Sequence, residues 1–225
     1  MNMPAVALRG LTILPGMIAH FDISRERSLR AVEEAMEQDQ KIYLVTQRNV
    51  DSEDPTQEDL YQMGIVADIK QVVRLQNDVV RILVDGISRA ALLGFTGNEK
   101  YLEAEICYCD SNADSLPEDL REAMLLGVRE AFHRYAAVVG KISKELIRQI
   151  DQYEDLEKLI DYVTNNLPVS YELKQQVLEA EDINDRYQVI VSLLLSQVEV
   201  ISIKNELQKK SKGSCGQASE GVCAS

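Results

Sequence analysis

The sequence has no tryptophan and two histidines, and aromatic residues make up only 5% of its 225 residues. Two histidines are too few for a histidine-rich metal site. Cysteine is also scarce: four residues fall as two close pairs, Cys107 with Cys109 and Cys215 with Cys223. A chain of this length buries enough apolar surface to fold without disulfides. We therefore expect a reducing, cytoplasmic location and no metal.

Basic residues are fewer than acidic residues, and the sequence has no long hydrophobic run. The chain has 24 Lys and Arg against 37 Asp and Glu, a net charge of −13, which repels phosphate backbones and anionic lipids. The richest apolar run, from Val189 to Ile203, is interrupted by polar side chains and is shorter than the ~20 apolar residues of a membrane span. The N-terminus lacks the charged and apolar regions of a signal peptide. We expect neither nucleic acid nor a membrane as a partner.

Common catalytic motifs are absent as well. A P-loop requires Gly, four residues, then Gly-Lys-Ser/Thr, but the single Gly-Lys, Gly140-Lys141, has Tyr135 five residues before Gly140 and Ile142 after Lys141. No Ser is followed three residues later by Lys, and Gly-x-Ser-x-Gly does not occur. We expect no catalytic residue and no cofactor in this chain.

What is present is a β-rich first half. Short runs with a period of two predict strands over residues 5–8, 18–23, 41–47, 63–75, 79–85, 89–95 and 101–109, with a break at Gly86. Ser24 is placed to cap a helix to about Gln38, with Leu29, Val32, Ala35 and Met36 as its buried stripe. Cys107 and Cys109 share a strand face, and we interpret them as small core-facing residues rather than metal ligands. The pattern favours a small β-barrel with one main helix over residues 1–112.

After Cys109 the period changes to 3.6. Ser115-Leu116-Pro117-Glu118 is a helix start, with proline and acidic residues in the first turn. Four apolar stripes follow, over residues 120–135, 156–163, 173–178 and 187–201. We expect an all-α bundle over residues 113–208, then a disordered tail over residues 209–225, where Gly, Ser, Ala and Cys replace the stripe. The fold class is α+β.

Two features are candidates for binding. Arg25, Arg27 and Arg30 lie in the first two turns of the predicted helix, where the helix dipole disfavours positive charge. They either pair with Glu26, Glu33 and Glu34 at helical spacing or recognise a ligand. The turn Leu14-Pro15-Gly16-Met17-Ile18 either presents an apolar tip that suits unfolded chains or packs Met17 and Ile18 into the core.

Several segments, in this order and spacing, resemble the N-terminal domain of the Lon ATP-dependent proteases. They are residues 4–10, Leu14-Pro15-Gly16-Met17, residues 24–33, 42–47, 54–61, 64–67 and 80–90, Asn166-Leu167-Pro168-Val169, residues 173–179 and Asp185-Arg186. The resemblance covers residues 4–208. This sequence departs from the family at Gln76-Asn77-Asp78, where a Gly is common, and after Lys210, where a long helix is usual.

The resemblance implies a PUA-like β-barrel joined to a helical bundle. It also implies the substrate-recognition and assembly region of a cytoplasmic AAA+ serine protease that degrades damaged or unfolded proteins. ATP, Mg and the catalytic chemistry belong to other parts of such a protease. Unfolded proteins and further copies of the chain are then the expected partners. The residues expected to bind substrate are Pro15, Gly16, Met17, Ile18, Arg25, Glu26, Arg27 and Arg30.

Two other readings compete with this function. PUA-like barrels can bind RNA, but a net charge of −13 and the lack of an aromatic and basic strip argue against it. A free-standing Lon-like domain that binds a partner protein or a small ligand is the alternative that remains.

Overall fold

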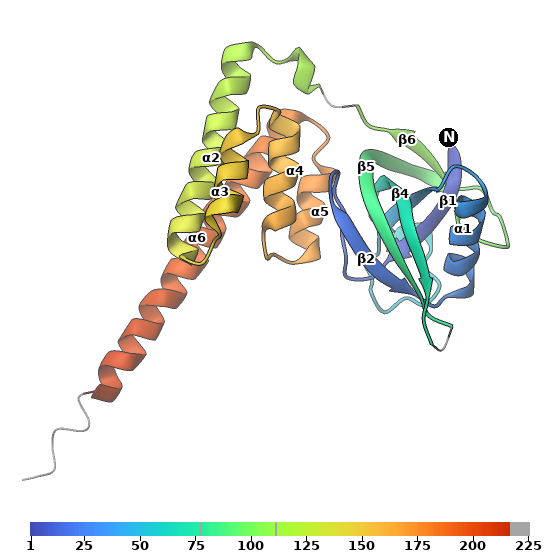
Figure 1. Cartoon of the computed structure of the whole chain (residues 1–225), viewed down its shortest axis with the longest axis horizontal. Helices are drawn as coiled ribbons and strands as arrows, with labels where there is room; N and C mark the ends of the chain where they lie inside the picture. Colours follow the sequence, from blue (N-terminus) through green and yellow to red (C-terminus); the bar gives the residue numbers. More distant parts are fainter. Residues whose placement is uncertain (77, 111, 217–225) are drawn as a thin grey trace, which may run out of the picture.

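The computed structural model describes residues 1–76, 78–110 and 112–216, which form a β-rich N-terminal part and a helical C-terminal part (Figure 1). The strands are β1 (Asn2–Leu8), β2 (Ile18–Ile23), β3 (Lys41–Thr46), β4 (Met63–Arg74), β5 (Val80–Phe95) and β6 (Glu103–Tyr108). Helix α1 (Glu26–Glu37) lies between β2 and β3, and short 3-10 turns occupy Gln57–Asp59 and Ala113–Ser115. The expected α+β class is confirmed.

The sheet closes into a barrel because β5 is long enough to pair twice. The strand order is β2-β5-β4-β3-β1-β6, and β6 pairs again with β5. The first half of β5 pairs with β2, from Ile23 opposite Val80 to Ile18 opposite Asp85, and its second half pairs with β6. Strand β2 is therefore attached to the barrel along one side only among the described strands.

Helix α1 packs on the barrel core. Ala31, Val32 and Ala35 are buried there, whereas Met36 is 39% exposed. The predicted stripe was wrong at Met36, because the buried face of α1 is made of Ser28, Ala31, Val32 and Ala35. The predicted cap was wrong too: Arg25 is the N-cap residue, and no side chain caps the helix.

Gly86 does not interrupt β5, contrary to expectation. A Cβ atom built there would lie 2.4 Å from the Leu14 carbonyl oxygen, so the strand passes too close to the β1–β2 connection for any other residue. The backbones are tied on both sides: the Gly16 N–H donates to the Gly86 carbonyl at 2.8 Å, and the Gly86 N–H donates to the Met17 carbonyl at 3.0 Å. Glycine at position 86 therefore allows the close approach of the two backbones and does not end the strand.

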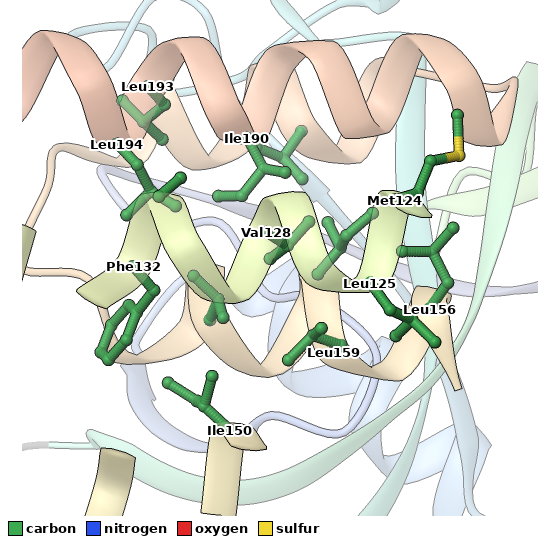
Figure 2. Close-up of a cluster of buried hydrophobic side chains, with 14 of the residues drawn as sticks. Met124, Leu125, Val128, Phe132, Ile150, Leu156, Leu159, Ile190, Leu193 and Leu194 are labelled. Atoms are coloured by element: carbon green, nitrogen blue, oxygen red, sulfur yellow. The ribbon is translucent and has the colours of Figure 1, made fainter. Parts of the chain in front are cut away.

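Five helices form the C-terminal part: α2 (Glu118–Val139), α3 (Lys144–Gln152), α4 (Leu156–Asn166), α5 (Tyr171–Glu179) and α6 (Ile183–Gly216). Their core packs α2 against α4 and α6, with Ile150 of α3 closing one side (Figure 2). The sequence stripes predicted α2, α4, α5 and α6. Helix α3 was not predicted as a separate element.

Helix α6 extends beyond the bundle (Figure 1). It continues to Gly216, so the expected disordered tail is wrong for residues 209–216, because an established helix propagates at little cost. The rest of that tail, residues 217–225, lies outside the described residues. Over Ile183–Gln208 this helix is long and apolar enough to cross a membrane by length and composition alone. However, Ile183, Ile190 and Leu194 pack in the helical core.

The two parts meet through buried polar contacts. Arg89 of β5 donates to both carboxylate oxygens of Asp161 of α4, at 2.8 and 2.5 Å, and both side chains are 6% exposed. Gln175 of α5 donates to the Met63 carbonyl at 2.9 Å and accepts from the Thr12 hydroxyl at 3.2 Å. These contacts fix the barrel on the bundle.

Candidate functional site

The arginine patch, Arg25, Arg27 and Arg30, lies at the start of α1. Arg25 donates to the Gln47 side-chain oxygen at 2.9 Å and to the Ser52 carbonyl at 3.0 Å. Arg27 reaches Asp54 and the Asn98 carbonyl, both at 3.3 Å. Arg30 alone forms a helical ion pair, with Glu26 at 2.5 Å. Of the two alternatives, helical pairing therefore accounts for one arginine of the three.

The patch remains accessible to a ligand. The Arg27 and Arg30 side chains are 40% and 48% exposed, and Glu26 is more exposed than either. Burial and the neighbouring Arg9 guanidinium lower the pKa of Arg25 from its ordinary value. The pKa of an arginine is so high that Arg25 still carries its charge at neutral pH.

The Pro-Gly turn is divided between the core and the surface. Leu14 is fully buried in the helical core, and Asn165 of α4 donates to the Pro15 carbonyl at 3.3 Å. Met17 packs against the barrel core, whereas Ile18 is 68% exposed. Only Gly16 and Ile18 of the expected turn are freely exposed, because Leu14 and Pro15 contact the bundle.

The structure does not bring the turn and the arginine patch together. They lie at opposite ends of β2, whose five residue steps from Ile18 to Ile23 span about 17 Å. Figure 1 shows β2 starting beside the bundle and ending on the side of α1. The expected site is therefore two patches joined by the unpaired side of β2.

A cavity of about 190 Å³ opens beside the arginine patch, between the end of β1, the end of β2 and the start of α1. Its lining includes Arg9, Ser24, Arg25 and Ser28. Arg9, Ser24 and Ser28 were not among the expected site residues. The signal available in the sequence was the clustering of two serines with the arginines in Ser24-Arg25-Glu26-Arg27-Ser28.

Within the described residues, Cys107 and Cys109 do not form a site with other ligands. Cys107 is exposed and Cys109 is half-buried, so the expected core position is wrong for Cys107. The cause is strand alternation, because Ala104 and Ile106 occupy the inward positions of β6. Among the residues that the structure describes, no three His, Cys, Asp or Glu side chains gather as metal ligands.

Comparison with known proteins identifies the family. Residues 2–196 match the family model described as the ATP-dependent protease La (LON) substrate-binding domain. "Lon protease" of Lachnoclostridium phytofermentans is 37% identical over 211 residues, covering 94% of this chain and 26% of that protein. "Lon protease 1" of Bacillus subtilis is 30% identical over 213 residues, covering 95% of this chain and 27% of that protein. The chain thus spans about a quarter of the length of the curated relatives that it matches.

Two solved structures share the fold. The N-terminal domain of the Mycobacterium avium complex Lon protease superposes with a TM-score of 0.70 at 18% identity, covering 86% of this chain and 98% of that domain. The Lon N-terminal domain protein of Xanthomonas campestris superposes with a TM-score of 0.59 at 12% identity, covering 85% and 98%. The sequence matches and this shared fold agree: the chain belongs to the family of Lon protease substrate-binding domains.

Proposed function

We propose that this chain captures unfolded or damaged proteins for an ATP-dependent serine protease. The observation that carries the proposal is the arginine patch, because two of its three arginines are exposed at a helix start within a chain of net charge −13. An extended polypeptide lying along the free side of β2 spans both this patch and the exposed Ile18 with about six residues. Pro15 and Met17 support the turn in this proposal, and Glu26 orients Arg30.

We also propose that ATP hydrolysis and peptide-bond cleavage lie outside this chain, which then needs no cofactor of its own. The missing P-loop and the missing Ser-x-x-Lys spacing support this division. A cytoplasmic location is part of the same proposal and is supported by the sparse cysteines in a chain that is large enough to fold without disulfides.

Reversing two charges in the patch tests the capture proposal. We expect Arg27→Glu combined with Arg30→Glu to lower photocrosslinking to a denatured protein by about fivefold or more. Exposed charges at the edge of a binding surface set the rate at which a flexible partner associates with it. Exposed substitutions usually change stability by only about ±0.5 kcal/mol, so the fold is retained. Thermal melting by circular dichroism checks this.

The matched control is Arg134→Glu combined with Arg148→Glu, which makes the same charge change on exposed positions of α2 and α3. We expect it to crosslink like the wild type. Equal crosslinking by the patch variant and the control would reduce Arg25 and Arg27 to contacts that hold α1 against the 47–54 loop, and Arg30 to its ion pair with Glu26.

Self-association is the second part of the proposed function. Val200, Ile203 and Leu207 share one face of α6 and are 58%, 60% and 62% exposed. Three large apolar side chains at this spacing are typical of a helix that packs against another helix. We propose that this face contacts the same face of a second copy.

Ile203→Glu is expected to shift the chain from oligomer to monomer in sedimentation velocity at micromolar concentration, because it places a charge in an apolar contact. Asn205→Glu is the control, since it adds the same side chain two residues away on another face of the helix. The proposed contact is wrong if the two variants sediment alike.

A further inference from the structure

We propose that the cavity at the start of α1 binds the C-terminal carboxylate of a polypeptide together with its apolar last side chain. This inference rests on the proposed function and names the part of the captured chain that the site reads. The cavity of about 190 Å³ is large enough for an end residue and too small for a folded partner.

Two guanidinium groups at the cavity share one backbone acceptor, and Arg25 also donates to the Gln47 side-chain oxygen at 2.9 Å. The Arg9 and Arg25 guanidinium groups both donate to the Ser52 carbonyl oxygen, at 2.9 and 3.0 Å, and the Gln47 side chain donates to the same atom at 3.1 Å. A carbonyl oxygen has two lone pairs, so three donors exceed its capacity. Asp54 and Glu53 act on Arg25 from a distance, and Asp54 makes its direct contact with Arg27. An anionic oxygen between the two guanidinium groups would satisfy both.

The backbone of α1 adds further donors. The helix begins at Glu26 without a side-chain cap, so no capping side chain competes with an anion for its first N–H groups and the positive end of its dipole. A helix start alone does not make a site.

Ser28 supplies an independent observation. It is 4% exposed, its side chain lines the cavity, and its hydroxyl has no hydrogen-bond partner in the described part of the chain. The hydroxyl is therefore available to the cavity, where a ligand oxygen would provide a hydrogen-bond partner.

The apolar floor of the cavity indicates which kind of anion binds there. It is the edge of the barrel core and consists of Val6, Leu8, Leu11, Phe21 and Ile23. An inorganic anion would leave this apolar surface uncovered. A carboxylate attached to an apolar side chain covers the floor and meets the donors at the rim. Every unfolded chain with a free end offers that pair of groups.

The experiment compares two fluorescent peptides of one sequence that ends in leucine, one with a free carboxylate and one with a C-terminal amide. Binding to the whole chain is followed by anisotropy. We expect the carboxylate peptide to bind about tenfold more tightly, since charge-assisted hydrogen bonds are lost in the amide. Arg9→Gln is expected to remove most of that difference. Arg148→Gln, the same change on α3, is expected to keep it.

Ser28→Ala gives a readout that a purely structural role would not produce. Removing a hydroxyl that holds no other part of the described chain should leave the urea midpoint unchanged, while binding of the carboxylate peptide weakens about threefold. Equal affinity for the two peptides, or equal binding by Arg9→Gln and the wild type, would overturn the inference. Acetate that binds as tightly as the peptide would show that the apolar side chain is not read, and it would overturn the inference as well.

Failure of this inference differs from failure of the proposed function. If a denatured protein with an amidated C-terminus is captured as well as the unmodified one, and the two peptides bind alike, the capture function stands without the carboxylate site. If carboxylate preference persists while no denatured protein is captured, the cavity assignment stands and the capture function is wrong.

Discussion

Asp161→Ala is expected to lower the free energy of unfolding by about 3 to 5 kcal/mol, the usual cost of removing one partner of a buried ion pair. Arg89 would keep its charge at a position only 6% exposed, with both hydrogen bonds lost. The buried Arg186 guanidinium adds to the cost, because Arg89 repels it and Asp161 offsets that repulsion. The loss is measured by urea denaturation with the tryptophan-free chain followed by circular dichroism.

Asp22→Ala is the matched control. Asp22 accepts two hydrogen bonds from Arg81, at 2.7 and 2.9 Å, but this pair lies at the surface, and we expect little change in stability. Replacing both members of the buried pair, by Arg89→Met with Asp161→Leu, is expected to restore most of the lost stability. An Asp161→Ala variant as stable as Asp22→Ala would show that water reaches the barrel–bundle interface.

Gly86→Ala is expected to cost about 3 kcal/mol, at the upper end of the usual range for an inserted methyl group. Its Cβ would lie 2.4 Å from the Leu14 carbonyl oxygen, a backbone atom that cannot rotate away. Separating the two segments would break the hydrogen bonds between Gly16 and Gly86 and between Gly86 and Met17. The same urea titration measures the loss.

Gly94→Ala tests whether strand position alone explains the effect. Gly94 lies in the same strand, β5, and its Cβ would have its nearest neighbour at 3.7 Å, an ordinary contact. We expect this variant to remain close to the wild type. Similar losses at Gly86 and Gly94 would contradict the steric explanation.

The elements that the sequence predicted well are those with a clear apolar period. Strands β2 and β4 and helices α2 and α4 have repeated inward positions, so their location follows from local pattern alone. The nine residues of α3 bury only Ile150 fully, and so short a stripe does not stand out among charged neighbours. Continuity of β5 through Gly86 depends on Leu14, 72 residues earlier, which no local pattern reveals.

The candidate site was predictable in part for the same reason. The helix dipole disfavours three arginines at a helix start. This unfavourable placement of charge made the patch a candidate binding site in the sequence. Their partners Ser52, Asp54 and Asn98 come from loops that fold back on α1 and give no local signal. The contacts of Leu14 and Pro15 with the helical bundle could not be predicted from the sequence either. The residues of an apolar turn are the same whether solvent or a layer of helices covers the turn.

Closure of the barrel has a consequence for synthesis of the chain. Strand β1 pairs with β6, and the Met1 amino group donates to the Ile106 carbonyl at 2.8 Å, so the first strand completes its pairing only with a segment about 100 residues later. At the usual translation rate the ribosome needs roughly 5 to 20 s to make that segment. During this interval β1 has an unpaired edge that can join other nascent chains. Fast elongation through residues 40–110 should therefore favour correct folding over aggregation.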